Sequence, residues 1–328
     1  MSFPFLIDDI FSLTNSNEFE KYALELFRYQ AVENKVYQRF INFLKVNPEN
    51  VRTLAEIPFL PIGFFKSFEI KTGEFSPEIT FTSSATTGSI PSKHLVKDKT
   101  IYFKSFEKAF KLFYADISEK PLLALLPSYL EREGSSLIVM ADALIKQSKR
   151  PESGFFLNNY EALVNTITDL ENKGETYFLL GVSFALLDLA EQFNLNLKNA
   201  IVIETGGMKG RRKEITRSEL HKQIKKGLGV SNVESEYGMT ELLSQAYARK
   251  IGLFETPPWM KVLARDTTDP LNLKTTGRGG INIIDLANIH SCAFIATQDL
   301  GKLHSNGKFE VLGRFDNAEV RGCNLMFS

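Results

Sequence analysis

The stretch Tyr177-Phe-Leu-Leu-Gly-Val-Ser-Phe-Ala185 decides the fold, because an uncharged run at 177–180 passes directly into a helical pattern over residues 184–193. A short apolar run of this kind is typical of a buried strand. Further strands are predicted at 122–126, 154–157 and 200–203, and further helices at 99–116, 135–147, 160–172 and 216–228. Strands that alternate with helices predict βαβ units and a mainly parallel sheet covered by helices, with ligand sites at the carboxyl ends of the strands.

The two ends of the chain differ from this α/β core. Residues 18–46 carry aromatic and aliphatic side chains at helical spacing between charges, which predicts amphipathic helices. The prolines of Ile57-Pro-Phe-Leu-Pro-Ile-Gly-Phe-Phe-Lys66 predict an extended, buried connector, because they cannot continue a helix. Near the C-terminus, short apolar runs are separated by Gly, Asn and Asp, as in a small antiparallel sheet or barrel. We therefore expect a helical N-terminus plus an α/β core at 1–255, and a β-rich subdomain at 256–328.

The composition argues against several classes of partner. Among 328 residues, 39 Lys and Arg balance 39 Asp and Glu, so no summed basic charge attracts a nucleic acid or an anionic membrane surface. The first residues lack the basic region of a secretory signal, and the uncharged run 176–187 is shorter than the roughly 18 apolar residues of a membrane span. Cys292 and Cys323 make no disulfide framework. We expect a cytoplasmic protein without a nucleic-acid partner or a membrane span, with Cys292 in the core.

Residues 82–92 contain seven hydroxyl side chains in eleven positions, together with a glycine, and Lys93 follows them. Hydroxyl and backbone N–H groups bond phosphate oxygens, Gly88 lets the backbone come close to a ligand, and Lys93 offsets negative charge. The segment therefore predicts a polyphosphate site. The alternative is a Ser/Thr-rich surface loop with a helix cap, since the spacing of a Walker motif is absent.

A second segment, Glu236-Tyr-Gly-Met-Thr-Glu241, places an aromatic ring, a hydroxyl and a carboxylate around a glycine turn. Tyr237 can stack on a base, Thr240 can bond a phosphate, and Glu241 can hold Mg²⁺ through oxygen. The alternative is a strand-to-helix turn in which Thr240 and Glu241 begin the helix.

A third group consists of Asp299, in Thr297-Gln-Asp-Leu-Gly301, and Arg314, in Gly313-Arg-Phe-Asp316. A carboxylate can accept hydrogen bonds from both ribose hydroxyls, and an arginine can bond a ribose or phosphate oxygen. Taken singly, the two residues also fit a turn aspartate and a surface cation.

In their order along the chain, these segments resemble the phosphate loop, the Tyr-Gly-x-Thr-Glu motif, the ribose-binding aspartate and the Gly-Arg hinge entry of the adenylate-forming enzymes, which include acyl-CoA synthetases and luciferases. Within that superfamily, the chain resembles most the acyl-protein synthetases of bacterial bioluminescence, also called long-chain fatty-acid luciferin-component ligases. The resemblance covers nearly the whole chain. It is also carried by residues 57–66, Ser92-Lys-His94, Pro127-Ser-Tyr-Leu130, Gly181-Val-Ser-Phe-Ala-Leu186, Glu204-Thr-Gly-Gly207 and Arg321-Gly-Cys323.

The resemblance implies an α/β fold like the N-terminal domain of these enzymes, and a two-step reaction. A fatty carboxylate attacks the α-phosphate of ATP, pyrophosphate leaves, and the acyl-adenylate then passes its acyl group to a protein cysteine. The superfamily pattern implies phosphate contacts for Ser83, Ser84, Thr86, Thr87, Gly88 and Lys93, and contacts with phosphate and Mg²⁺ for Thr240 and Glu241. It implies that adenine is bound by Gly206, Gly207, Tyr237 and Gly238, and ribose by Asp299 and Arg314. It also implies that the acyl channel is bordered by Gly181, Ser183 and Phe184.

The sequence departs from the family pattern at several points. Ala85 stands where the phosphate loop usually has glycine, and Tyr129 takes the place of an aromatic-His gate. The sequence stops six residues after the hinge-like Gly322, without the large C-terminal lobe of acyl-CoA synthetases. A protein thiol is therefore expected as the acceptor rather than coenzyme A. Cys323 is the candidate thiol, and an acyl-acceptor or acyl-reductase protein is the candidate partner.

Two further functional classes remain open from the residues. The 177–185 stretch approximates the nucleophile elbow of an α/β-hydrolase, with Ser183 as nucleophile and Asp299 and His304 as partners. A catalytically silent nucleotide-binding protein is the other. The four histidines show no paired metal-ligand spacing. Only His94, at the end of the phosphate loop, is expected to act on the carboxylate or phosphate, and surface or capping roles are expected for His221, His290 and His304.

Overall fold

The computed structural model describes residues 5–83, 90–127, 134–207, 212, 215–250 and 252–315. The chain divides into two compact units, one made of residues 78–257 and the other of residues 1–77 together with 258–328. The N-terminal helices therefore belong with the C-terminal strands, whereas the division expected from sequence, 1–255 and 256–328, joined them to the α/β core.

Residues 78–257 form the α/β unit around a six-stranded sheet with the order β5-β4-β6-β7-β8-β9. Neighbouring strands from β5 to β8 run parallel, and only the β8–β9 pair is antiparallel. The mainly parallel sheet predicted from sequence is confirmed. Its strands are β4 (Leu122–Leu125), β5 (Gly154–Phe155), β6 (Tyr177–Val182), β7 (Ala200–Thr205), β8 (Glu234–Tyr237) and β9 (Ala246–Ala248).

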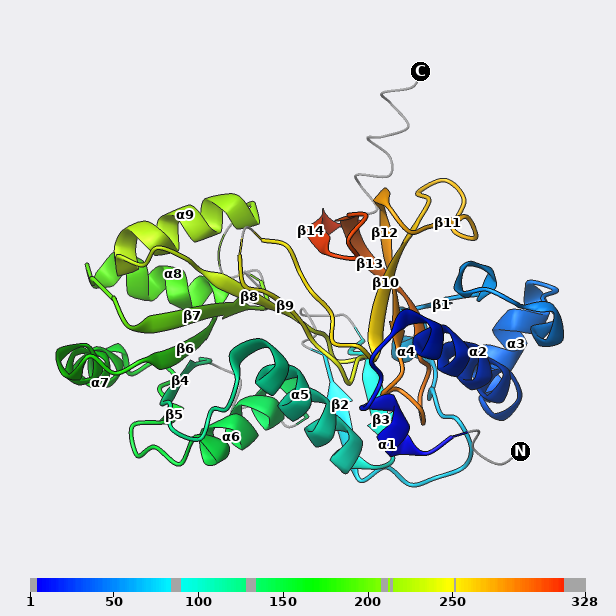
Figure 1. Cartoon of the computed structure of the whole chain (residues 1–328), viewed down its shortest axis with the longest axis horizontal. Coiled ribbons are helices and arrows are strands. Elements are labelled where there is room, and N and C mark those ends of the chain that lie inside the picture. Colours follow the sequence, from blue (N-terminus) through cyan, green and yellow to red (C-terminus); the bar gives the residue numbers. More distant parts are fainter. Residues whose placement is uncertain are drawn as a thin grey trace, which may run out of the picture. The chain divides into compact units, whose positions relative to one another are not determined.

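Helices cover both faces of this sheet, with α8 and α9 on one side and α5 and α6 on the other (Figure 1). Asp98, Ser135, Asn159 and Thr216 cap their first turns by accepting hydrogen bonds from backbone N–H groups. These side chains satisfy donors that a helix cannot pair internally, and so fix where each helix begins. The helices are α5 (Lys99–Tyr114), α6 (Ser136–Ser148), α7 (Tyr160–Lys173), α8 (Ser183–Gln192) and α9 (Arg217–Leu228).

A separate antiparallel hairpin, β2 (Ile79–Thr82) and β3 (Lys93–Val96), also belongs to this unit. Thr82 pairs with Lys93 at the end of the hairpin next to the connecting loop. Beyond that pair, Ser83 N–H donates to Ser92 O at 3.1 Å, and Ser92 N–H donates to Ser83 Oγ at 2.8 Å. The hairpin therefore fixes both ends of the predicted phosphate loop.

The other unit is built on an antiparallel sheet from the C-terminal part of the chain. Its order is β1-β13-β12-β10-β11, with β14 also paired to β13, and only the β1–β13 pair is parallel. The antiparallel sheet expected from the turn-rich pattern is confirmed. Its strands are β1 (Leu60–Pro61), β10 (Met260–Arg265), β11 (Leu273–Lys274), β12 (Gly277–Asp285), β13 (Phe294–Leu303) and β14 (Phe309–Arg314).

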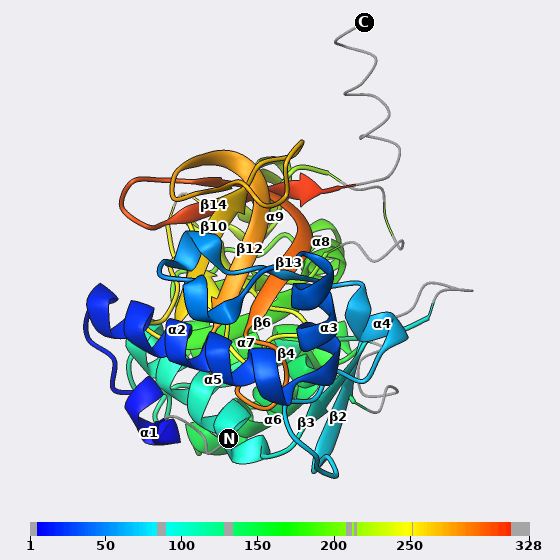
Figure 2. The ribbon, with the colours of Figure 1, turned by 90° about the vertical axis from the view of Figure 1, so that its right-hand side faces the viewer.

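The N-terminal helices pack on this sheet, and Figure 2 shows α2 and α3 lying across β12 and β13. Within residues 57–66, Leu60–Pro61 is extended and pairs with β13, but a short helix begins at Phe64, so the segment is extended only in part. Its apolar side chains are largely buried, as expected. The helices are α1 (Ile7–Ile10), α2 (Ser16–Glu33), α3 (Lys35–Phe43) and α4 (Phe64–Ser67), with short 3₁₀ turns at Pro48–Asn50 and Leu54–Glu56.

Two buried amide side chains explain why the chain ends combine. Gln30 Nε2 donates to Asn288 O at 2.9 Å, and Gln30 Oε1 accepts from Ala293 N–H at 2.9 Å. Asn34 Nδ2 donates to Ser291 O at 3.0 Å. Buried backbone groups in the turn before β13 need partners, and the N-terminal helices supply them. Cys292, in the same turn, is buried as expected, and burial raises the pKa of its thiol to about 12.

No helix in the described part of the chain is long and apolar enough to cross a bilayer.

Candidate functional site

His94 joins two segments that the sequence analysis treated separately. It lies on β3 and is buried, and its Nδ1 is 2.9 Å from Thr240 O in the Tyr237–Glu241 segment. A carbonyl oxygen only accepts, so Nδ1 donates. Burial lowers the pKa of His94 to about 4, against a smaller opposite effect of the Thr240 bond. At neutral pH the ring is therefore neutral, with its proton on Nδ1.

The segment after β8 does not begin a helix. Residues 238–245 form turns that lead to β9, so the alternative in which Thr240 and Glu241 start a helix is wrong. Tyr237 is buried, and the centre of its ring lies 5.7 Å from that of Phe254. The Arg217 guanidinium lies 4.8 Å from the centre of the same Phe254 ring. Glu241 is also buried, whereas Lys93 on the hairpin is exposed.

The predicted adenine and acyl-channel residues meet at the ends of β6 and β7. Gly206 follows β7 with φ +71, which glycine adopts without strain. Ser183 Oγ, at the start of α8, donates to Glu204 Oε1 at 2.6 Å and lies 3.4 Å from Gly206 O. Gly181 and Phe184 flank Ser183 at this buried strand-to-helix junction. The structure thus brings together two groups of residues predicted separately.

Two buried glutamates at the same edge of the sheet were missed. Glu204 is 2% exposed, with Arg217 Nε and His221 Nε2 each 3.7 Å from its Oε2. Burial alone raises the pKa of Glu204, but His221, Arg217 and the Ser183 hydroxyl together outweigh it, and the net pKa is lowered. Glu236 is 7% exposed and accepts a hydrogen bond from Thr205 Oγ1.

The sequence carried only a weak signal for this cluster. Glu204 and Glu236 each stand near the end of a strand, and Glu204 follows the apolar run of β7 directly. A carboxylate in that position must find partners or stay neutral. His221, expected to have a surface or capping role, instead contacts the cluster, with Nε2 3.2 Å from Ser235 Oγ.

In the other unit, the predicted ribose residues lie opposite each other. Asp299 on β13 is paired in register with Arg314 on β14, and Arg314 Nε is 3.5 Å from Asp299 Oδ1. The Arg314 side chain is 81% exposed and that of Asp299 is 11% exposed. Asp299 N–H donates to Thr297 Oγ1 at 3.1 Å, which fixes the backbone beneath the carboxylate.

Arg265 supports this pair and was not predicted. Its guanidinium donates to Asn282 Oδ1 at 2.8 Å, to Ile281 O at 3.0 Å and to Thr297 O, and it lies 5.3 Å from the Phe315 ring. A Cβ added to Gly280 would overlap with the Arg265 guanidinium. The Arg265 side chain on β10 therefore bonds to β12 and β13, and it stacks on Phe315, the residue after β14.

Six predicted site residues lie outside the described part of the chain. They are Ser84, Thr86, Thr87, Gly88, Tyr129 and Cys323.

The described residues contain no cluster of three or more His, Cys, Asp or Glu that could hold a metal by itself. A single buried carboxylate such as Glu241 fits Mg²⁺, which commonly takes one or two protein carboxylates and completes its shell with phosphate oxygens and water. The residues present are thus compatible with a metal that arrives with a nucleotide.

The hydrolase alternative receives no support from the partners observed. Ser183 donates to a glutamate, while His304 Nε2 lies 2.8 Å from Glu310 Oε1 and Asp299 faces Arg314. Ser183 is not among the described residues with a positive φ angle. Its backbone therefore lacks the strain of a nucleophile elbow.

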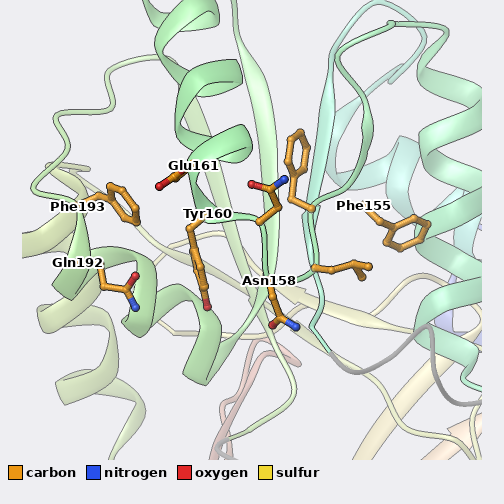
Figure 3. A pocket seen from close by; sticks show the side chains of 9 residues that line it. Phe155, Asn158, Tyr160, Glu161, Gln192 and Phe193 are labelled. Atoms are coloured by element: carbon orange, nitrogen blue, oxygen red, sulfur yellow. The ribbon is translucent and has the colours of Figure 1, made fainter.

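An open pocket of about 730 Å³ lies in the α/β unit. Tyr160 and Phe193 stack in it with centroids 6.4 Å apart, and Asn158 and Gln192 project beside them (Figure 3). It contains none of the predicted site residues. Its lining consists of residues 155–161, Gln192 and Phe193.

Comparisons with known proteins give one family and several similar structures. A family model described as acyl-protein synthetase, LuxE, matches residues 147–328. ATP-bound MatB from Rhodopseudomonas palustris is similar in structure, with a TM-score of 0.53 and 16% identity over 74% of this chain and 49% of that one. This chain thus spans about half the length of MatB.

A second similar structure is 2-hydroxyisobutyryl-CoA ligase in complex with 2-HIB-AMP and CoA in its thioesterification state. Its TM-score is 0.64, at 13% identity, over 97% of this chain and 74% of that one. The open conformation of the same ligase gives a TM-score of 0.63 at 12% identity. No curated protein matches the sequence. These likenesses show that the fold is that of the N-terminal part of adenylate-forming enzymes.

Proposed function

This chain belongs to the LuxE acyl-protein synthetase family, and from that premise we propose that it converts a carboxylic acid, most simply a long-chain fatty acid, into an acyl-adenylate. The acyl group then passes to a protein cysteine. One observation carries the proposal: His94, on the strand that follows the predicted phosphate loop, bonds to Thr240 O, so this strand and the Tyr237–Glu241 segment are held together. The proteins of similar structure, crystallised with ATP or with an acyl-AMP, support the same chemistry.

In the first step, a carboxylate oxygen of the acid bonds to the α-phosphorus of ATP, and the bond to the bridging oxygen breaks to release pyrophosphate. Both reactants are anions, so the barrier is lowered mainly by positioning and by offsetting charge. We assign phosphate contacts to Ser83, Ser84, Thr86, Thr87, Gly88, Lys93 and Thr240. Neutral His94 holds Thr240 through its backbone and adds no charge of its own.

Glu241 would hold Mg²⁺, which supplies further neutralisation of the phosphate charge when it is bound. Gly206, Gly207, Tyr237 and Gly238 would enclose adenine, and Asp299 with Arg314 would bind ribose. The buried β6–α8 junction at Gly181, Ser183 and Phe184 would border the acyl chain, with Tyr129 as its gate.

In the second step, a thiolate attacks the acyl carbonyl carbon, the thioester forms, and AMP leaves with the electron pair of the broken bond. The thiol is Cys323 of this chain, and the thioester then serves a partner protein that accepts or reduces the acyl group. These reactions fit a protein of the cytoplasm, where thiols stay reduced.

Acid-dependent exchange between ATP and labelled pyrophosphate tests the first step. We expect exchange that needs Mg²⁺ and one class of acid from a panel running from acetate to palmitate with several aryl acids. Glu241→Gln should lower the exchange rate by about 100-fold or more, because it removes a charge that stabilises the transition state through the metal.

Glu219→Gln is the matched control, since Glu219 is exposed on α9 and its loss should leave exchange unchanged. A Cys323→Ser variant separates the steps: it should keep exchange and lose the protein-bound thioester. Tight ATP binding without exchange for any acid would contradict the proposal and favour a silent nucleotide-binding protein.

A further inference from the structure

Glu236 occupies an unusual position at the edge of the parallel sheet. Successive strand residues point to opposite faces. Glu204 is in register with Ser235, and both contact α9 through His221. The next residues, Thr205 and Glu236, then face the opposite side of the sheet, where the Thr205 hydroxyl donates to Glu236 Oε2.

The Glu236 carboxyl fills space that the following turn leaves open. A Cβ added to Gly238 would overlap with Glu236 Oε1, and it would also touch the Gln245 side chain. Glu236 therefore lies against the turn at Gly238 while it bonds to Thr205, the residue that precedes Gly206 and Gly207. Both stretches are those assigned above to adenine.

The surroundings of Glu236 disfavour a negative charge. Burial raises its pKa to about 7; the Thr205 hydrogen bond opposes this, and the nearby charge of Glu204 adds to it. The described part of the chain places no cation within ion-pair distance of Glu236. Arg217 and His221 lie instead beside Glu204.

The other groups that face Glu236 are buried hydroxyls and an amide. Tyr102 on α5 and Tyr247 on β9 both have pKa values raised mainly by burial and further by the Glu236 charge, so neither becomes anionic near neutral pH. Gln245 Oε1 and Tyr247 OH are buried without a hydrogen-bond partner among the described residues. A protonated carboxyl offers a donor in a region where such acceptors are unsatisfied.

We propose that Glu236 is a positioning residue that works as a neutral acid: its carboxyl ties the Thr205–Gly207 turn to the Tyr237–Glu241 segment, and its ionisation places an uncompensated buried charge beside the nucleotide site, which weakens binding there. This inference rests on the nucleotide binding in the proposed function. ATP brings several negative charges to these segments and should therefore favour the protonated form. Binding above neutral pH is then accompanied by uptake of one proton, which moves from the buffer to the Glu236 carboxylate.

The pH dependence of ATP affinity tests this assignment. If only the protonated form binds well, the wild-type dissociation constant for a non-hydrolysable ATP analogue rises by roughly tenfold between pH 7 and 8.5, because the competent fraction falls. Calorimetry in buffers of different ionisation enthalpy should show linked proton uptake at pH 8. Glu236→Gln, which mimics the neutral acid, should keep the pH 6.5 affinity, lose the alkaline rise and take up no proton.

Two further variants separate positioning from general folding effects. Thr205→Val removes the hydroxyl that bonds to Glu236, and should weaken the analogue several-fold at pH 6.5 where wild type binds best. Glu107→Gln is the matched control, because Glu107 on α5 also has a pKa raised by burial but bonds to Gln147. It should leave the pH profile unchanged.

Thermal unfolding without ligand gives an independent reading. The folded-state pKa of Glu236 lies above its unfolded value, so its protonated form stabilises the fold at low pH and that stability is lost as pH rises toward 7. Wild type should lose melting temperature relative to Glu236→Gln between pH 5 and 8.

An alkaline rise in dissociation constant that persists in Glu236→Gln, or its absence in wild type, overturns the inference. Because binding is measured without the acid, failure of pyrophosphate exchange alone leaves this result standing.

Discussion

The residues assigned to the nucleotide are held differently in the two units. In residues 78–257, His94, Tyr237 and Glu241 are buried, and hydrogen bonds such as that between His94 and Thr240 link separate elements. In the other unit, Asp299 and Arg314 face each other on neighbouring strands, and the Arg314 side chain is 81% exposed. Buried polar networks fix geometry before a ligand arrives, whereas an exposed ion pair is worth only about 0–1 kcal/mol. Tyr237 and the Thr240–Glu241 turn are therefore preorganised, and the ribose pair is left for the ligand to order.

The largest expected effect comes from the packing that supports the buried cluster. A Cβ added to Gly227 on α9 would overlap with the backbone of Ala190 on α8. Gly227→Ala should therefore lower the free energy of unfolding by about 2 kcal/mol, although alanine is ordinarily the better helix residue. Urea unfolding measures this.

The matched control lies in the other unit. Gly63 has φ −58 and no atom near the position of a Cβ, so Gly63→Ala should change stability by no more than about 0.5 kcal/mol. Equal effects at both glycines would mean that α9 can shift away from α8 freely, and that the α/β unit is not the more rigidly packed of the two.

A smaller effect is expected at Asp299, and only when ligand is present. Asp299→Asn keeps the shape but removes the charge that accepts ribose hydroxyls, so the affinity for an ATP analogue should fall by about tenfold. The melting temperature without ligand should stay unchanged. A large loss of stability would contradict the view that this pair is ordered by the ligand.

The smallest effect is expected at Arg314. Arg314→Ala should weaken the analogue by about two- to threefold at low salt, because an exposed cation contributes little. The difference from wild type should vanish in 1 M NaCl, where screening acts over about 3 Å. Titrations at two salt concentrations check this, and a salt-independent loss would show that Arg314 makes a desolvated contact.

The sequence predicted those parts of the fold that local patterns determine. The apolar runs at 122–126, 177–180 and 200–203 are parallel strands, as expected. Strand β8 was missed because Glu234, Ser235 and Glu236 are polar. Ser235 and Glu236 are nevertheless buried, and their hydrogen-bond partners, His221 and Thr205, lie elsewhere in the chain.

The candidate site was predicted as separate segments, and their contacts were not. Nothing local in the sequence indicates that His94 reaches Thr240, or that Arg265 bonds to Thr297 across the sheet. An arginine at the end of a strand resembles a surface cation until its neighbours are known. The packing of the N-terminal helices with the C-terminal strands was not predicted for the same reason, because the partner residues of Gln30 stand about 260 positions later.

Because the N-terminal helices pack with C-terminal strands, the two units can be completed only at different times during synthesis. Helices α2 and α3 leave the ribosome first, yet the turn at 288–293 that bonds to Gln30 and Asn34 is made more than 250 residues later. Residues 78–257 have all their own strands before that turn exists. Domains generally fold as units while the chain grows. The α/β unit can therefore form first, and the aromatic face of α2 and α3 has no native sheet to cover until translation has passed β13.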